Sequence, residues 1–413
     1  MAVMSENIYD LVIIGAGAAG LMAAAEASHA GVRVLVLEGQ REPGVKILMA
    51  GGGRCNATHA RVSAGDYSAG CRHTLMHVLK TFTPREAVAF FEKWGAPLAL
   101  QETGEFFSAD NHARTVRDAL VRAAVDGGAR IECQAHVDAL TAHAGMFKVV
   151  AGAMAYAARS VLITTGGLSF PVTGSDGSGY ALAAALGHRI VPTRPALVPL
   201  MAGNPAFSGL AGIVVAVRLS LWSGDRKLRS QEGPLLFTHH GFSGPAPMEM
   251  SGAWMAAREQ HACALRVDFL PAAAGDGIDF IFDPLSARRS VKNVLARMLP
   301  ERLVVVLLEQ AGVDPGRLAG DLGRQEKRKL AAALRALPLP VAESAGYAKA
   351  EVTAGGVDLR ELKGATLESR LQGGLFFAGE VVDVDGRIGG FNLHWAWASG
   401  VAAARAVIRR IKI

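Results

Sequence analysis

The stretch YDLVIIGAGAAGLMAAAEASHAGVRVLVLEGQ, from Tyr9 to Gln40, predicts the fold of the first part of the chain. Its apolar run Val12 to Ile14 is typical of a buried parallel strand, and the small residues from Ala18 to Ala30 favour a helix that lies close to a sheet. A second strand then ends at Glu38. The order strand, glycine turn, helix, strand indicates one βαβ unit of a Rossmann-type α/β sheet.

Glycines in the turn of this unit form the pattern GxGxxG. In a dinucleotide-binding turn one glycine permits the bend, one lets the backbone approach a pyrophosphate, and one permits close packing of the helix. The pyrophosphate would then lie at the helix N-terminus, and Glu38 would bind a ribose hydroxyl. An acid at that position disfavours a 2′-phosphate, which leaves FAD or NAD. The residues expected to bind here are Gly15, Gly17, Ala18, Ala19, Gly20 and Glu38.

Three further segments favour FAD over NAD. The first is VKILMAGGGRCNATH, Val45 to His59, whose glycines allow backbone N–H groups to approach a flat ring or a phosphate. The second is VLITTGG, Val161 to Gly167, a buried strand that ends in Thr-Gly-Gly. The third, Gly373 to Gly400, reads as a strand, then Gly379 and Glu380, then a loop and a helix. Glu380 is well placed there to accept hydrogen bonds from a ribityl chain.

The helix that opens at Phe391 to Leu393 has a predicted role at the flavin. Its unpaired N–H groups and its positive dipole end would stabilise negative charge on the carbonyl edge of reduced flavin. Gly389 and Gly390 would let the backbone come close enough. Lys46 and Arg54 lie in or beside the glycine-rich loop, so we expect them at the flavin edge rather than on a substrate carboxylate.

Composition restricts the class of protein and its partners. The chain has 413 residues, of which 50% are hydrophobic, and this predicts two domains or one domain with an insertion. Its formal charge of +6 comes from scattered Lys and Arg, with dense clusters only at Arg324 to Lys329 and Arg409 to Lys412. No basic stripe is interleaved with aromatic residues along the sequence, so we expect no nucleic-acid partner.

The cysteines and the N-terminus indicate a cytoplasmic protein without a metal. The four cysteines have no spacing typical of metal ligands, and Cys55 is expected to be a structural thiol beside the flavin. The first residues lack a basic n-region, and the apolar run Leu11 to Ala25 is broken by glycines and too short to span a bilayer. We therefore expect no membrane partner; the sequence does not indicate an oligomeric state.

Five motifs extend along nearly the whole chain: Gly15 to Gly20, KILMAGGGRCN (46–56), TTGGLSFPVTGSDGSGYALA (164–183), PLLFTHHGFSGPAPMEMSG (234–252) and GEVVDVDGRIGGFNLHWAWASG (379–400). With these motifs the chain resembles a family of bacterial FAD-dependent flavoproteins, which includes aminoacetone oxidase and an enone reductase acting on 3-dehydro bile acids. Two residues depart from the family pattern: Glu105 replaces the basic group of an Arg-Val-Phe-Pro run, and Arg387 replaces a small or neutral residue.

The resemblance implies an FAD-binding domain made from both ends of the chain, with an inserted domain that is β-rich and then helical. We place the first part of the FAD domain at 1–190, the insertion at 191–345 and the return segment at 346–413. Within the insertion, 213–222 and 263–270 read as strands, and 290–308 and 324–337 read as helices. The full FAD set, beyond the first turn and Glu38, is Lys46, Gly51, Gly52, Gly53, Arg54, Cys55, Asn56, Val137, Thr165, Gly166, Gly379, Glu380, Gly390, Phe391, Asn392 and Leu393.

The predicted function is that of an oxidoreductase with non-covalent FAD and a small organic substrate. It would oxidise an amine or reduce the double bond of an enone at flavin N5, with His239, His240 and His394 as candidate acids or bases. No second GxGxxG follows a strand, so NAD(P)H would bind only transiently at the flavin. The alternative is a flavin-binding RNA-modification or scaffold protein.

Overall fold

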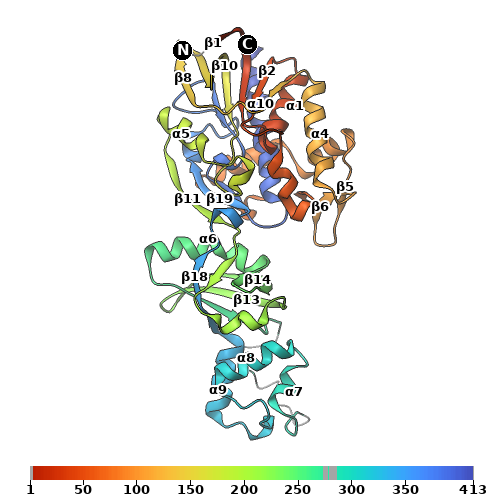
Figure 1. Cartoon of the computed structure of the whole chain (residues 1–413), viewed down its shortest axis with the longest axis vertical. Coiled ribbons are helices and arrows are strands. Elements are labelled where there is room, and N and C mark those ends of the chain that lie inside the picture. Colours follow the sequence, from red (N-terminus) through yellow and green to blue (C-terminus); the bar gives the residue numbers. More distant parts are fainter. Residues whose placement is uncertain (1–2, 273–277, 279–285, 413) are drawn as a thin grey trace. The chain divides into compact units, whose positions relative to one another are not determined.

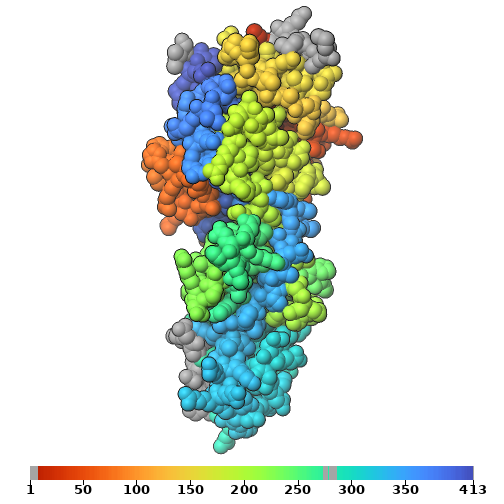
Figure 2. All heavy atoms as spheres, turned by 90° about the vertical axis from the view of Figure 1, so that its left-hand side faces the viewer, coloured from red at the N-terminus to blue at the C-terminus, as the bar shows by residue number. Residues whose placement is uncertain are grey.

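The two ends of the chain fold together into one unit, and the middle of the chain forms a second. Unit 1 comprises Met1–Pro195 and Glu351–Ile413, and unit 2 comprises Ala196–Ala350. The computed structural model describes residues 3–272, 278 and 286–412. In Figure 2 the first segment of unit 1, red to yellow-green, and its return segment, blue, lie side by side.

A seven-stranded sheet forms the centre of unit 1, in the order β7-β2-β1-β10-β9-β8 with β20 also paired to β10. β7, β2, β1, β10 and β20 run parallel, whereas β8 and β9 are antiparallel additions. β20 comes from the return segment, so both chain ends complete the sheet. This confirms the predicted Rossmann-type α/β fold. Figure 1 labels β1, β2, β8 and β10 of this sheet. The strands are β1 (Val3–Ile14), β2 (Val34–Leu37), β7 (Arg130–Glu132), β8 (Ala139–His143), β9 (Met146–Ala151), β10 (Met154–Ile163) and β20 (Leu375–Phe377).

Helices α1 and α10 pack closely in unit 1 because small residues line their contact. A Cβ at Gly400 of α10 would lie 2.5 Å from the carbonyl oxygen of Ala19 in α1. Trp395 and Trp397 of α10 are buried, and their indole N–H groups donate to the carbonyl oxygens of Gly379 and Ala57. The helices are α1 (Ala18–His29), α2 (Arg72–Thr81), α3 (Pro84–Lys93), α4 (Ala113–Asp126), α5 (Ser178–Ala185) and α10 (Phe391–Ile411).

Three small sheets complete unit 1. The first half of the proline-rich run Val191 to Met201 forms β11, whose partner among the described strands is β19. Proline is tolerated there because an edge strand leaves one row of N–H positions unpaired. The sheets are β3 (Asn56–His59) with β6 (Glu105–Ser108) and β5 (Leu98–Leu100), β4 (Tyr67–Ala69) with β21 (Val384–Gly386), and β11 (Ile190–Ala196) with β19 (Val352–Val357).

Unit 2 is a mixed β and helical insertion with its own apolar core. Its sheet has the order β17-β16-β13-β14-β15-β12-β18. The predicted strands and helices are present, with the first helix divided at Pro300, while α6 (Pro245–Gln260) was not predicted. The other elements are β12 (Leu200–Ala202), β13 (Val214–Ser223), β14 (Arg226–Phe237), β15 (Gly241–Ser243), β16 (Ala264–Asp268), β17 (Leu337–Leu339), β18 (Val341–Ser344), α7 (Val291–Leu295), α8 (Glu301–Ala311) and α9 (Arg324–Arg335).

Short 3-10 helices join these elements in both units. They are η1 (Val45–Gly53), η2 (Ala64–Asp66), η3 (Pro171–Thr173), η4 (Pro205–Leu210), η6 (Ala319–Asp321), η7 (Tyr347–Lys349), η8 (Leu359–Glu361) and η9 (Gly379–Val381).

The α1–α10 contact predicts opposite effects for two helical glycines. Alanine normally stabilises a helix interior by about 0.5–1 kcal/mol relative to glycine. Gly252→Ala in α6 should do so, because its Cβ would make an ordinary contact of 3.6 Å with Ala196. Gly400→Ala should instead lower the free energy of unfolding by about 1–3 kcal/mol, since the backbone of α1 or α10 must move to admit the Cβ. Calorimetric melting of both variants tests this; equal stabilisation by both would contradict it.

Candidate functional site

The carboxyl ends of the parallel strands bring the predicted FAD segments to one edge of the unit 1 sheet. Gly15 follows β1, Glu38 follows β2, Thr165 follows β10, and Gly379 with Glu380 follows β20. In open α/β sheets, ligands bind outside the carboxyl ends of the strands. The edge is therefore the candidate cofactor site.

The three glycines of the first turn differ in what surrounds them. A Cβ at Gly15, whose φ is +101°, would lie 2.7 Å from the Thr164 carbonyl oxygen, and one at Gly20 would overlap the Gly15 carbonyl oxygen. Gly17 has an ordinary φ of −77°, and the nearest protein atom to its added Cβ is 3.9 Å away. Gly15 and Gly20 are thus required by the fold, whereas Gly17 leaves space for a ligand.

Glu38 is held facing this turn. One carboxylate oxygen accepts from the Ala16 N–H at 2.7 Å, and the other accepts from the Gln40 N–H at 2.9 Å. The segment before Val137 runs beside it, because the Ala135 N–H donates to the Glu38 carbonyl oxygen at 2.8 Å. Val137 itself is buried in the core, and its contact with the cofactor stays a prediction.

The glycine-rich loop that ends η1 has three successive residues with positive φ. Gly51, Gly52 and Gly53 have φ values of +58°, +66° and +87°. A Cβ at Gly51 would lie 2.9 Å from the Asn56 nitrogen, but one at Gly52 would meet no described atom within 4 Å. Gly51 is needed to fold the loop, while Gly52 leaves its backbone open to a ligand.

Cys55 and Arg54 follow this loop and differ in exposure. Burial raises the pKa of the Cys55 thiol to about 12, so the thiol is neutral and unreactive at neutral pH. This supports the structural reading of Cys55. Arg54 is exposed, and its guanidinium lies 4.4 Å from the centre of the Phe107 ring. Its contact with the flavin edge stays a prediction.

Lys46 and Glu380 form an ion pair that joins the first segment to the return segment. The Lys46 Nζ lies 2.6 Å from a Glu380 carboxylate oxygen and 2.6 Å from the Ser169 hydroxyl. The other Glu380 oxygen accepts from the Ser169 hydroxyl at 2.5 Å and from the Thr353 N–H at 3.0 Å. Sequence reasoning missed Ser169 and Thr353, because their role depends on Glu380, which lies far away in the sequence. The network fixes the Glu380 carboxylate, and its flavin contact stays a prediction.

The start of α10 has the features expected for binding a negative group. The backbone N–H groups of Phe391, Asn392 and Leu393 have no acceptor within the described parts of the chain. The Asn392 side chain instead fixes the preceding loop, donating to the Gly386 carbonyl oxygen at 2.9 Å and accepting from its N–H at 2.8 Å. These N–H groups and the space at Gly17 and Gly52 fit an anionic dinucleotide with a flavin ring.

The Gly-Gly pair before α10 has a second role that sequence reasoning missed. Gly390 has a φ of +86°, and a Cβ there would lie 2.5 Å from the Asn56 side-chain oxygen and 2.9 Å from the Thr58 carbonyl oxygen. A Cβ at Gly389 would lie 2.9 Å from the Phe391 ring. Gly390 therefore also lets the helix start against β3, while the approach of both glycines to the flavin stays a prediction.

His394 lies in the first turn of α10 and is completely buried. Its Nδ1 is 2.9 Å from the Thr58 hydroxyl, and burial lowers its pKa to about 4, opposed by the Phe82 backbone and by Glu86. The imidazole is thus neutral at neutral pH and inaccessible to a substrate. A catalytic role for His394 stays a prediction that this burial disfavours.

His239 and His240 occupy the turn between β14 and β15 in unit 2, and both side chains are exposed. The turn is closed by Thr238, whose N–H donates to the Gly241 carbonyl oxygen at 2.8 Å. Within the described chain neither imidazole makes a hydrogen bond, and the two rings lie 6.5 Å apart between their centres. They are not needed to cap the turn, and their catalytic role stays a prediction.

His59 is a titratable residue beside the α10 start that sequence reasoning did not select. It is half-buried and stacks on Phe391, with 5.0 Å between ring centres. The guanidinium of Arg387 lies 4.8 Å from the centre of the same ring and pairs with Asp66 at 2.9 Å. The sequence shows only that His59 ends the glycine-rich segment Val45 to His59. Its position beside α10 follows from the close approach of Gly390 to Thr58, which the sequence alone does not show.

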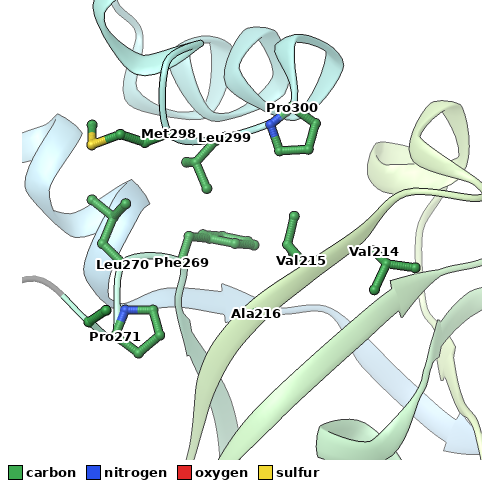
Figure 3. A pocket seen from close by; sticks show the side chains of 10 residues that line it. Val214, Val215, Ala216, Phe269, Leu270, Pro271, Met298, Leu299 and Pro300 are labelled. Atoms are coloured by element: carbon green, nitrogen blue, oxygen red, sulfur yellow. The ribbon is translucent and has the colours of Figure 1, made fainter.

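A pocket of about 550 Å³ in unit 2 is lined by apolar side chains (Figure 3). None of the described residues that line it has a titratable group to move a proton, so the pocket is not a candidate for the chemistry. Its lining residues are Val214, Val215, Ala216, Phe269, Leu270, Pro271, Ala272, Met298, Leu299 and Pro300. Among residues 3–272, 278 and 286–412, no helix is long and apolar enough to cross a membrane, and no cluster of His, Cys, Asp and Glu could hold a metal.

Residues 9–406 match the family described as HI0933-like protein Rossmann domain. The chain belongs to this family. It is 35% identical over 97% of its length to a ribosomal RNA dihydrouridine synthase of Escherichia coli, of which the match covers 98%. It is 32% identical over 96% of its length to a 3-dehydro-bile acid delta(4,6)-reductase of Clostridium scindens, of which the match covers 98%.

A solved structure shares the fold of this family member. The 3-ketosteroid delta1-dehydrogenase of Sterolibacterium denitrificans aligns over 98% of this chain and 100% of its own, with a TM-score of 0.52 and 14% identity. That likeness concerns the fold alone. Together with the family and the site, the relatives identify an FAD-dependent oxidoreductase.

The space at Gly17 predicts a variant that separates cofactor binding from folding. Gly17→Ala should fold normally, because its Cβ has room, but should weaken FAD binding on the order of tenfold or more by blocking the pyrophosphate. Gly20→Ala is the matched control, which should also lower the melting temperature of the apoprotein. Flavin absorbance per protein and melting of the apoprotein measure both effects. Full FAD content in Gly17→Ala would contradict this assignment.

The buried His394 predicts a pH-dependent contribution to stability. Its pKa falls from 6.5 to about 4 on folding, so between these values the unfolded chain binds the extra proton. The contribution of neutral His394 to the free energy of unfolding should therefore be complete above pH 6.5. It should decrease as the pH falls toward 4, by at most about 1.4 kcal/mol per pH unit. The difference in unfolding free energy between wild type and His394→Gln should change with this slope. Parallel pH profiles would show that His394 does not titrate in this way.

Proposed function

We propose that the protein reduces a carbon–carbon double bond conjugated to a carbonyl group, with FAD held non-covalently, and that this bond belongs to a uridine of ribosomal RNA. The observation that supports this most is the 35% identity, over 97% of the chain, with a ribosomal RNA dihydrouridine synthase. Dihydrouridine is uridine whose C5=C6 bond, conjugated to the C4 carbonyl, has been reduced. RNA thus replaces the expected small organic molecule as the preferred substrate.

The second named relative supports the same bond chemistry. A 3-dehydro-bile acid delta(4,6)-reductase takes a substrate whose double bonds are conjugated to a ketone. The two relatives differ in substrate size, but both names describe a carbonyl-conjugated double bond and its reduced form. Amine oxidation, the other reaction expected from the sequence, has no such support from these two relatives.

Reduction adds one hydride and one proton across the double bond. Bound FAD would supply hydride transfer to the substrate carbon, with transiently bound NAD(P)H as the source of the hydride. The chain's part is to bind the dinucleotide through the Gly17 turn and Glu38, and to orient its ribityl part through Glu380. The free N–H groups of Phe391 to Leu393 would stabilise negative charge at the flavin carbonyl edge.

The proton requires an acidic group that solvent can recharge. His239 and His240 are exposed and make no hydrogen bond within the described chain, and either imidazolium could donate from a ring nitrogen. His59 is the further candidate, because it lies against Phe391 at the start of α10. His239, His240 and His59 are thus the three candidate proton donors, and the buried His394 has a packing role.

A second candidate function is reduction of an enone in a free small molecule. It is supported by the 32% identity, over 96% of the chain, with the bile acid reductase. A flavin-dependent scaffold without turnover has no comparable support from these relatives.

The proposal predicts dihydrouridine in a defined reaction. Ribosomal RNA of the source organism, transcribed without modifications, is incubated anaerobically with the flavoprotein and NADH or NADPH, then digested and analysed by mass spectrometry. We expect dihydrouridine to accumulate with wild type and to fall in proportion to FAD content with Gly17→Ala. A parallel reaction contains a 3-oxo-Δ4 steroid as a small enone. Reduction of the enone with no dihydrouridine would replace the RNA proposal by the second candidate.

A further inference from the structure

One face of the unit 2 sheet has a tryptophan between two cations. Trp222, near the end of β13, pairs across the strands with Lys227 of β14 and with Ala264 of β16. The Lys227 Nζ lies 5.7 Å from the centre of the Trp222 ring, and the Arg266 guanidinium carbon lies 4.9 Å from it. Three strands therefore bring one aromatic ring and two positive charges together.

Among the described residues, the cations at this end of the sheet have no carboxylate partner. Within the described residues no ion pair involves Lys227, Arg266, or the neighbouring Arg226 and Arg229 of the same hairpin. Arg218, farther along β13, is different: it pairs with Glu232 at 2.7 Å and with Asp268 at 3.6 Å. Carboxylates therefore balance the positive charge at Arg218, in the middle of the face, but described carboxylates do not balance it near Trp222.

Trp222 lacks the features of a tryptophan retained for the core. The residue as a whole is half-buried, and its indole nitrogen is buried without an acceptor in the described structure. Trp395 and Trp397, in contrast, are buried and donate to backbone carbonyl oxygens. Its recorded neighbours include two cations in cation–π contact with the ring, and such weak contacts can be exchanged for a phosphate or a base.

Polar groups continue the same face beside the ring. Ser220 of β13 pairs with Ser230 of β14 on one side and with Arg266 on the other, and the two hydroxyl oxygens are 3.5 Å apart. Hydroxyl groups on a sheet can bond to ribose and phosphate oxygens. The face thus combines a stacking ring, uncompensated cations and hydroxyls, the combination by which proteins bind single-stranded RNA.

We propose that the Trp222 surface, defined as Trp222, Lys227 and Arg266 with Ser220 and Ser230, contacts the single-stranded RNA that flanks the modified uridine. This inference rests on the proposed RNA substrate. Lys227 and Arg266 neutralise phosphates and a base stacks on Trp222. The FAD site alone would not distinguish RNA from a small enone, and this surface of the insertion would select RNA.

Binding of RNA to variants tests this surface. The probe is a single-stranded, uridine-containing oligonucleotide of ~20 nucleotides from the source ribosomal RNA, measured by fluorescence anisotropy over a salt series. Lys227→Ala with Arg266→Ala should weaken binding and lower the slope of log affinity against log salt by about 1.4, because each lost phosphate contact accounts for about 0.7. Trp222→Ala should weaken binding about tenfold, and Trp222→Phe should restore much of it.

A matched control removes the same charge elsewhere on unit 2. Arg328 and Lys329 are exposed on α9, and Arg328→Ala with Lys329→Ala should change affinity and slope much less. Flavin content and melting temperature verify that each variant is folded. An equal loss in the control would overturn the assignment, because binding would then reflect net charge alone.

The outcomes separate this surface from the proposed function. If wild type forms dihydrouridine but the Trp222, Lys227 and Arg266 variants bind RNA as wild type does, only the surface is wrong. If wild type neither binds RNA in a salt-dependent way nor forms dihydrouridine, the proposed RNA substrate and the proposed RNA-binding surface are both wrong.

Discussion

The parallel pairing of β20 with β10 is the interaction on which the site depends. It aligns Leu375 to Phe377 with Val161 to Ile163 and so brings Glu380 to the same sheet edge as the Gly15 turn. The Lys46–Glu380 ion pair and the close contact of Gly400 with Ala19 join the same two chain segments. Because the two ends form one sheet, the middle of the chain is free to fold as a separate unit. A cofactor at this edge therefore requires both ends of the sequence.

The sequence predicted best those features whose cause is local. Gly15, Gly17 and Gly20 lie within one turn, so their spacing alone indicated the dinucleotide site and the βαβ unit. Glycine is needed at position 390 because its backbone lies close to Asn56 and Thr58, which are far away in the sequence. No local sequence pattern indicates this contact. His394 looked reactive because it is polar in an apolar helix, but its environment comes from Thr58 and burial. The helix α6 was missed because its prolines and Gly252 resemble a loop, although proline is favoured at a first helical turn.

The functional conclusion rests on chemistry that the two named relatives have in common. A uracil ring and a 3-oxo steroid both present a double bond polarised by a carbonyl group, so one flavin site can serve either after a change of substrate surface. Along the sequence the basic residues appeared scattered, which argued against RNA. Strand pairing in unit 2 brings Arg266, which is distant along the sequence, to the ring of Trp222, and no pattern along the sequence shows this. Specificity in this account therefore belongs to the insertion, and hydride chemistry to the unit formed by the chain ends.

The central claim, that electrons pass from the bound flavin to a uridine in RNA, is tested most directly by a single-turnover measurement. The flavoprotein is reduced with one equivalent of NAD(P)H without oxygen and mixed with unmodified ribosomal RNA while flavin absorbance is followed. The account predicts that the oxidised spectrum returns with RNA, that dihydrouridine forms in equal amount, and that RNA already containing dihydrouridine at the site has no effect. A flavin that stays reduced with RNA, yet reoxidises with a small enone, would contradict the account.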